Sequence, residues 1–184
     1  DESRQHFAEK VVYLPHSYQA NDRKRLISDK KFTRKELGLP ENGFVFCCFN
    51  HDYKINPPMF KVWMDLLKEV PGSVLWLMKL NESAQANLTN KALKHGVDSS
   101  RLVYATRVPR VEDHLARYRL ADLFLDTFPY NGHTTVGDAL FAGLPVISLC
   151  GESFASRVAK SLLHDVVLKE LFCSDLKEYF SKTL

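Results

Sequence analysis

Short runs of apolar residues recur along the chain, and within each run the apolar positions do not alternate with polar ones. Continuous runs of this kind are typical of strands that are buried on both faces of a sheet. The pattern therefore predicts five buried strands, at Phe44–Phe49, Ser73–Met78, Leu102–Ala105, Leu123–Asp126 and Pro145–Leu149.

Between the predicted strands, apolar residues recur every three or four positions, which indicates helices. The clearest stripe runs from Met59 to Val70, after Asn56 and two prolines and before a Pro-Gly pair. Proline is favoured in the first turn of a helix and glycine just after the last, so this helix has both boundaries marked. Four further helices are predicted, at about 83–95 and around Val111–Tyr118, Val136–Leu140 and Ala155–Leu162.

Strands that alternate with helices of about ten residues predict an α/β fold. We expect a Rossmann-like three-layer domain, in which helices cover both faces of a mostly parallel sheet. In such sheets, ligands bind at the carboxyl ends of the strands. The loops that follow Asn50, Ala105, Asp126 and Cys150 are therefore the expected locations of functional residues.

Composition excludes several classes of function. The chain of 184 residues is 45% hydrophobic and 26% charged, which is the balance of an ordinary globular domain. Its formal net charge is only +3, and the basic clusters at 23–25 and 30–35 are typical of a solvated connector. Nucleic-acid binding is therefore not expected.

Other signatures are missing from the sequence. No apolar stretch is long enough to cross a membrane, and the four cysteines lack metal-like spacing. We expect buried, reduced thiols, no membrane association, no metal and a cytoplasmic location. The absence of HExxH, Walker, GxGxxG and GxSxG motifs argues against a metalloprotease, a P-loop ATPase and an esterase.

The segment from Asp126 to Asp138 carries the most chemical information. It joins a strand end to a turn and then to a helix that begins near His133 or Thr134. Free backbone N–H groups at a helix start, beside hydroxyls and an imidazole, form a site for a phosphate or diphosphate. Asp138, one turn later, could accept hydrogen bonds from the hydroxyls of a ribose. A plain helix cap with an acid in an early turn explains this segment equally well.

Two other loops add candidate residues. Lys54 follows the first predicted strand and could neutralise a leaving diphosphate, although a lone loop lysine, like its neighbour His51, is more often solvated. Further along, Arg110, His114 and Arg117 are spaced to share one helix face, where planar side chains could stack on a base. A polar face with ion pairs is the more common explanation of such spacing. Its position at a strand's carboxyl end favours binding.

Six segments follow one another along the chain: Phe-Asn-His-Asp-Tyr-Lys-Ile, Pro-Gly-Ser-Val-Leu-Trp-Leu, Leu-Ala-Asp-Leu-Phe-Leu-Asp-Thr, Asn-Gly-His-Thr-Thr, Ala-Gly-Leu-Pro-Val and Gly-Glu-Ser-Phe-Ala-Ser-Arg-Val. Taken together and in this order, they resemble the carboxyl-terminal catalytic lobe of O-GlcNAc transferases, particularly of bacterial ones. The match spans about Phe44–Leu163, and Leu14-Pro-His-Ser-Tyr18 resembles the end of that family's amino-terminal lobe. The resemblance implies two parts. Residues 1–40 would be the end of the amino-terminal lobe and the connector between the lobes, and residues 41–184 would be the nucleotide-sugar-binding lobe.

The resemblance implies a GT-B enzyme with two Rossmann-like lobes, inverting chemistry, UDP-GlcNAc or a related UDP-sugar as donor, and no metal or other cofactor. Lys54 would be the catalytic residue, which contacts the diphosphate and assists the departure of UDP. Asp138 would bind the ribose. The remaining residues that the match implies are His51 for the phosphates or sugar, His133, Thr134 and Thr135 for the phosphates, and Val108, Arg110, His114 and Arg117 for the uracil.

We therefore expect the donor-binding lobe of an inverting UDP-GlcNAc-dependent protein O-glycosyltransferase, which transfers sugar to Ser or Thr. Most of the amino-terminal lobe and the TPR helices that recruit protein acceptors in this family are missing from this chain. Alone, it is expected to bind nucleotide weakly and to be inactive or nearly so. No residue qualifies as the general base. Two alternatives stay open: another UDP-sugar GT-B enzyme, such as a UDP-GlcNAc 2-epimerase, and a non-catalytic nucleotide-binding module that regulates a partner.

Overall fold

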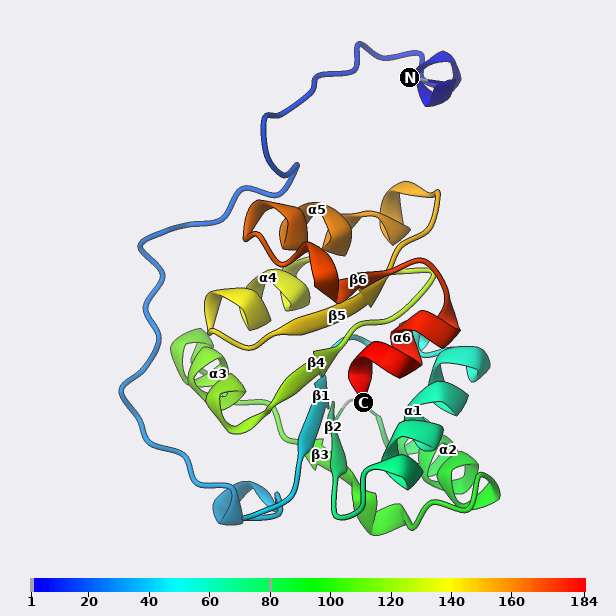
Figure 1. Cartoon of the computed structure of the whole chain (residues 1–184). Helices are drawn as coiled ribbons and strands as arrows, with labels where there is room; N and C mark the ends of the chain where they lie inside the picture. The colour runs from blue at the N-terminus through cyan, green and yellow to red at the C-terminus, as the bar shows by residue number, and fades with distance from the viewer. Residues whose placement is uncertain (1, 80) are drawn as a thin grey trace.

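The computed structural model, which describes residues 2–79 and 81–184, is built around a six-stranded parallel sheet (Figure 1). The order across the sheet is β3-β2-β1-β4-β5-β6, and every neighbouring pair is parallel. The predicted α/β fold is confirmed, and the five predicted strands are present with small differences at their ends. The strands are β1 Val45–Cys48, β2 Val74–Met78, β3 Leu102–Ala105, β4 Leu123–Leu125, β5 Val146–Leu149 and β6 Phe172–Cys173.

Helices cover both faces of the sheet, with α3, α4 and α5 on one face and α1, α2 and α6 on the other (Figure 1). The α-helices among the described residues are α1 Pro57–Glu69, α2 Glu82–Lys94, α3 Val111–Arg117, α4 Thr134–Phe141, α5 Val158–Asp165 and α6 Leu176–Thr183. Short 3-10 turns lie at Glu2–His6, Lys35–Leu37, Asp52–Lys54, Ser99–Arg101, Tyr118–Leu120, Phe154–Ser156 and Lys169–Leu171.

The boundaries of the helices follow from capping. Asn56 accepts a hydrogen bond from the Met59 backbone N–H at 3.1 Å, so α1 begins where the Asn-Pro-Pro sequence predicts. The helix predicted around Ala155 begins later than expected, because Ser153 caps a separate 3-10 turn at Phe154–Ser156. The α-helix itself starts only at Val158.

The last β-strand and helix were not predicted from the sequence. β6 is only two residues long, too short to stand out as an apolar run. In the structure, α6 packs against α1 through Tyr179, which is fully buried. The Tyr179 hydroxyl accepts from Trp63 Nε1 at 3.4 Å and donates to the Asp126 carbonyl at 3.2 Å. The final helix therefore supports the carboxyl end of β4.

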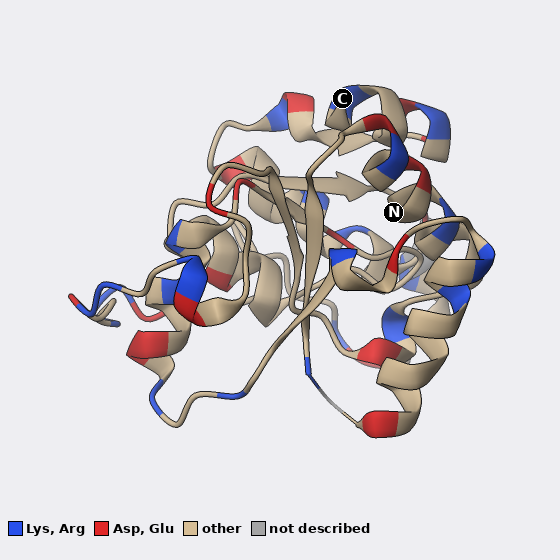
Figure 2. Ribbon diagram, turned by 90° about the horizontal axis from the view of Figure 1, so that it is seen from below, with Lys and Arg blue, Asp and Glu red and all other residues tan. Residues whose placement is uncertain are grey.

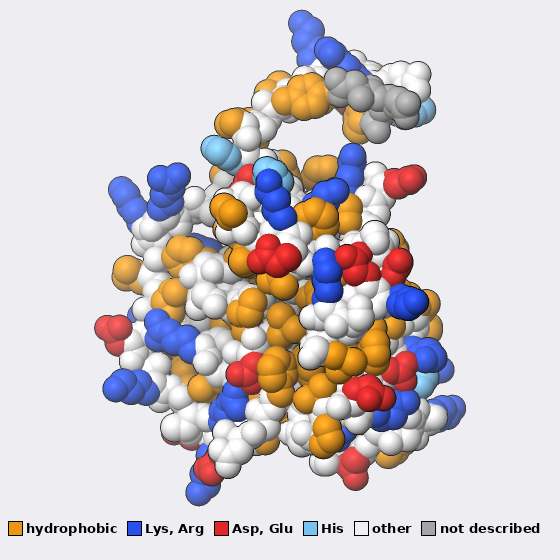
Figure 3. Space-filling model, viewed as in Figure 1, with side chains coloured by type: hydrophobic (Ala, Val, Ile, Leu, Met, Phe, Trp, Pro, Cys, Tyr) orange, Lys and Arg blue, Asp and Glu red, His pale blue; other side chains and the backbone are white. Residues whose placement is uncertain are grey.

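The residues before β1 run as an extended chain along one side of the domain, past α5, α4 and α3 (Figure 1). At the amino-terminal end this chain stands off the domain body, and Val12 is 78% exposed (Figure 3). The prediction that the basic clusters are solvated was wrong for two members. Arg25 is paired with Asp138 at 2.5 Å, and Arg34 with Asp122 at 2.8 Å, because each faces a carboxylate on the domain.

Charged side chains of both signs are distributed over the helices and loops, and the central strands are free of them (Figure 2). None of the described helices is long and apolar enough to cross a membrane. Within residues 2–79 and 81–184, no group of three His, Cys, Asp or Glu side chains could hold a metal ion. The four cysteines are free thiols, and Cys47, Cys48 and Cys173 are buried.

Replacing Tyr179 with Phe tests how much α6 stabilises the sheet. We expect the free energy of unfolding in urea to fall by about 1–3 kcal/mol, because the Trp63 indole N–H and the Asp126 carbonyl lose a buried partner. The matched control is Tyr53→Phe, at a side chain that is 68% exposed, with an expected change of about 0.5 kcal/mol or less. Equal effects of the two substitutions would contradict this role for Tyr179.

Candidate functional site

The strand order reverses between β1 and β4. The chain moves from β1 outward to β2 and β3, and then returns to β4 on the other side of β1. The connections that leave β1 and β4 therefore diverge to opposite faces of the sheet, and open α/β sheets bind ligands at such a point. Lys54 lies in the connection after β1, and α4 follows β4. The topology thus brings together the two parts of the predicted diphosphate site.

Lys54 lies beside the start of α4. Its Nζ donates to the Asn131 backbone carbonyl at 2.8 Å and is 3.8 Å from the centroid of the Tyr130 ring. Burial lowers the pKa of the Lys54 ammonium, and the nearby carboxylate of Asp126 opposes this shift. An ammonium held this close to a helix start is the arrangement that the diphosphate hypothesis requires.

The start of α4 has no side-chain cap. His133 is the N-cap residue, and its side chain makes no capping hydrogen bond. The first backbone N–H groups of the helix, from Thr134 onward, thus keep their capacity to bind an anion. The hydroxyl of Thr135 donates inward to Asn50 Oδ1, which leaves only its backbone N–H for a ligand. A Cβ at Gly132 would lie 2.5 Å from Thr135 Oγ1, so this close packing requires glycine.

The carboxylate of Asp126, which is fully buried, holds the loop before α4 in place. Its Oδ1 accepts from the Gly132 backbone N–H at 2.6 Å and from Asn50 Nδ2 at 3.0 Å, and its Oδ2 accepts from Ser148 Oγ at 2.7 Å. Burial raises the pKa of Asp126 to about 6, and these three hydrogen bonds work in the opposite direction. One carboxylate therefore joins the ends of β1 and β4, the loop before α4 and β5.

The imidazole of His133 lies at the helix start, where it makes ring contacts with Tyr130 and Phe154. Burial lowers its pKa, and the positive charge of Lys54 lowers it further. The ring is consequently neutral near pH 7, and Lys54 supplies the positive charge beside the helix start. Nδ1 of His133 is 2.6 Å from the Tyr18 hydroxyl.

The residues predicted to bind the uracil base lie in the loop after β3 and on helix α3. Arg117 is only 1% exposed, and its guanidinium donates to the Thr106 carbonyl at 2.6 Å and to His114 Nδ1 at 2.8 Å. His114 is half-buried against Phe49, and burial together with the charge of Arg117 lowers its pKa to about 4. Arg117 therefore holds the loop and the imidazole in place from behind.

The prediction that Arg110 shares a helix face with His114 and Arg117 was wrong. Arg110 has an extended backbone and precedes α3, and its exposed side chain lies 3.6 Å from Glu112. Val108 is half-buried in the same loop. His51, at the start of the β1 loop, is exposed and stacks on Tyr53 rather than on the helix start.

Sequence reasoning missed the residues that support the site. Asn50 and Asp126 each directly follow an apolar run, and a polar residue at the end of a buried strand is the signal that could have identified them. The contacts of Asp138 with Arg25 and of Thr134 with Gln19 gave no such signal, because more than a hundred residues separate the partners.

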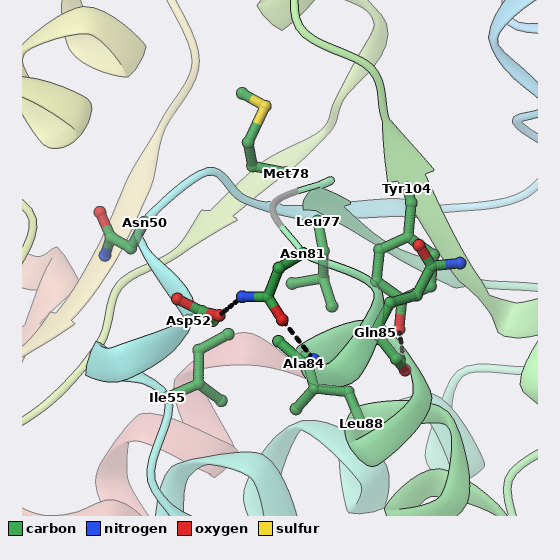
Figure 4. A pocket seen from close by; sticks show the side chains of 10 residues that line it. All are labelled: Asn50, Asp52, Ile55, Leu77, Met78, Asn81, Ala84, Gln85, Leu88 and Tyr104. Carbon is green, nitrogen blue, oxygen red and sulfur yellow. Dashed lines mark hydrogen bonds between the residues drawn. The ribbon is translucent and has the colours of Figure 1, made fainter.

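A small pocket lies between the β1 loop, the end of β2 and α2 (Figure 4). Asn81 bridges it by donating to Asp52 Oδ2 at 3.0 Å and accepting from the Ala84 backbone N–H at 2.7 Å. Its cavity volume of about 10 Å³ is room for a single water molecule, so it cannot hold a nucleotide. At this pocket, the hydrogen bond from Asn81, the N-cap residue of α2, to Asp52 connects α2 to the loop that carries Lys54.

Known proteins are similar to this chain over most of its length. The model of glycosyl transferase family 41 matches residues 28–183. The probable UDP-N-acetylglucosamine--peptide N-acetylglucosaminyltransferase SEC of Arabidopsis thaliana is 39% identical over 184 residues, covering 97% of this chain and 19% of that protein. The UDP-N-acetylglucosamine--peptide N-acetylglucosaminyltransferase of Caenorhabditis elegans is 39% identical over 149 residues, covering 81% of this chain and 13% of that protein.

Two solved structures are also similar to this chain. A mutant O-GlcNAc transferase of Thermobaculum terrenum matches with a TM-score of 0.83 and 30% identity, over 98% of this chain and 34% of that one. A sucrose-phosphate synthase of Thermosynechococcus elongatus matches 80% of this chain and 37% of that one, with a TM-score of 0.56 and 15% identity, which indicates a shared fold alone. The chain thus spans between 13% and 37% of the length of each of these proteins.

The pKa of Asp126 leads to a stability prediction. Because the folded-state pKa of about 6 exceeds the ordinary 3.8, stability should fall as pH rises through this interval, by roughly 3 kcal/mol for this group. Asp126→Asn keeps an acceptor for Gly132 and Asn50 and can donate to Ser148, so the variant should gain stability relative to the parent between pH 4 and 7. Urea unfolding at several pH values measures this difference.

Asp126→Ala is the matched contrast. It removes the acceptor as well as the charge, and leaves the Gly132 N–H and the Asn50 amide without it, which should cost about 3 kcal/mol or more at every pH. A stability difference between the parent and Asp126→Asn that does not change with pH would contradict the assigned titration.

Proposed function

Because this chain belongs to glycosyl transferase family 41, we propose that it is the donor-binding part of an inverting transferase that moves N-acetylglucosamine from UDP to Ser or Thr of proteins. The observation that carries the proposal is the position of Lys54, whose Nζ lies 2.8 Å from the Asn131 carbonyl, just before the uncapped start of α4. The transferase names of the relatives favour transfer to protein over epimerisation or a purely regulatory role.

In the proposed reaction, a hydroxyl of the acceptor attacks the anomeric carbon in line with the departing UDP. The bond from that carbon to the β-phosphate oxygen breaks, and its electron pair stays on UDP. The first N–H groups of α4 and the Lys54 ammonium stabilise the negative charge that develops there. The proposal requires no metal, because fixed dipoles and one cation provide this stabilisation. The base that takes the acceptor proton is a group of the amino-terminal lobe or a phosphate oxygen.

Other predicted residues would contact the base, the ribose and the phosphates of the donor. His114, held by Arg117, would face the uracil, while the loop backbone from Val108 to Arg110 would read the edge of the base. Asp138 would accept hydrogen bonds from the ribose. His133 and Thr134 would contact the phosphates, with Thr135 contributing its backbone N–H because its hydroxyl is engaged with Asn50.

Protein acceptors, the choice of sugar and turnover are proposed for the whole protein, of which this chain is a part. The exposed side chains from Val12 to Leu14 are proposed to pack into the amino-terminal lobe, since an exposed apolar run of this kind is typical of an interface. A cytoplasmic location is proposed as well, on the basis of the four free thiols.

Replacing Lys54 with Ala tests the diphosphate site. We expect the affinity for UDP, measured by an NMR titration of the chain, to fall roughly 10- to 100-fold, because one charge-assisted contact to the phosphates is lost. The matched control is Lys61→Ala, at an exposed lysine paired with Asp65 on α1, which should leave the affinity unchanged. Unchanged affinity in Lys54→Ala would place the diphosphate elsewhere.

The chain by itself should bind UDP weakly and transfer sugar poorly or not at all, because most of the proposed amino-terminal lobe is absent from it. Incubation with UDP-[³H]GlcNAc and an acceptor protein, followed by counting of protein-bound label, measures transfer. The matched positive control is the full-length protein. Turnover by the chain alone at the rate of the full-length protein would contradict the two-lobed site.

A further inference from the structure

The chain before β1 crosses the start of α4 and contacts the groups proposed to bind the donor. We refer to residues 18–25 as the overlying segment. Within it, the Tyr18 hydroxyl lies 2.6 Å from His133 Nδ1, and Gln19 Nε2 donates to Thr134 Oγ1 at 3.4 Å. Arg25 Nη1 donates to Asp138 Oδ1 at 2.5 Å. Three residues of the proposed donor site, His133, Thr134 and Asp138, thus have hydrogen-bond partners in the overlying segment.

The contact between Arg25 and Asp138 is the most enclosed of the three. The side chains are 22% and 12% exposed, and the guanidinium carbon lies 4.6 Å from the centroid of the Phe141 ring. Arginine commonly binds a carboxylate through two parallel hydrogen bonds. Here only one is made, so Asp138 Oδ2 accepts no hydrogen bond from the described residues.

The remaining donors of Arg25 are also without partners. Nε and Nη2 are buried and make no hydrogen bond within the part of the chain that the structure describes. Buried donors without acceptors are unfavourable, and a bound ligand is one way of satisfying them. An open carboxylate oxygen beside two unused N–H groups suits a vicinal diol, which both donates and accepts hydrogen bonds.

We propose that the overlying segment is one wall of the donor site, and that Arg25 is the residue that positions Asp138 for the ribose of the nucleotide. This inference rests on the proposed function. Arg25 holds Oδ1 at 2.5 Å and leaves Oδ2 available to the hydroxyls. Asp138 binds the diol directly, and Arg25 acts through it.

The Tyr18 contact serves His133 in the same way. A phenol hydroxyl is a better donor than acceptor, and a neutral imidazole has one acceptor nitrogen. Tyr18 therefore donates to Nδ1 and leaves the ring proton on Nε2. The segment thereby fixes the orientation of the imidazole and of the carboxylate, which lie at opposite ends of the first turns of α4.

The test compares UDP with 2′,3′-dideoxyuridine 5′-diphosphate, which lacks both ribose hydroxyls, in NMR titrations of the full chain. The unsubstituted chain should prefer UDP. Arg25→Met, which keeps an unbranched side chain without charge or donors, should weaken UDP binding roughly five- to tenfold and leave the affinity for the analogue almost unchanged. Arg25→Lys should restore part of the preference, because an ammonium can still reach the carboxylate.

Arg23→Met is the matched control, since Arg23 is exposed two residues away, and it should leave both affinities unchanged. Tighter UDP binding in Arg25→Met would overturn the inference by showing that Arg25 blocks Asp138. Equal weakening for both nucleotides would also overturn it, because the effect would then be structural. Failure of the unsubstituted chain to bind either nucleotide would instead contradict the proposed function, and equal binding of both would overturn the ribose role of Asp138.

Discussion

The buried carboxylate of Asp126 is the interaction on which the site depends. It lies at the end of a central strand and accepts hydrogen bonds from an amide at the end of β1, a backbone N–H in the loop before α4 and a hydroxyl on β5. Burying this carboxylate is costly, as its raised pKa indicates. In return, four chain segments keep a common geometry. The loop that orients the start of α4 is held in place by a backbone hydrogen bond to this carboxylate.

Hydrogen bonds connect Asp126 to the other residues of the candidate site. Asn50 donates to Asp126 and accepts from Thr135, so the end of β1 and the first turn of α4 are bound through a single side chain. The loop after Asn50 is short, which brings Lys54 back over the Asn131 carbonyl. A cation and the positive end of a helix are then adjacent, and both favour a ligand with negative charge at this place.

The candidate site also includes chain from outside the sheet. Tyr18, Gln19 and Arg25 precede β1 by twenty residues or more, yet they contact His133, Thr134 and Asp138. In the proposed two-lobed enzyme, this segment would join the lobes and lie against the donor site, so that it would couple nucleotide binding to the placement of the other lobe. The tight pair of Arg25 with Asp138 is the part of this arrangement with the clearest chemical consequence.

The sequence by itself determined the layer architecture, because unbroken apolar runs alternate with helical stripes, and buried strands and amphipathic helices can be identified from local periodicity. It also placed Lys54 and the residues around Thr134 after strand ends, while the family resemblance supplied their proposed roles. β6 escaped prediction because two residues cannot show a period. Only the tertiary structure decided that Arg117 is buried behind His114, that Arg110 turns away toward Glu112, and that Arg25 reaches Asp138. These outcomes depend on which side chains meet across the fold, and spacing along the chain does not specify such long-range contacts.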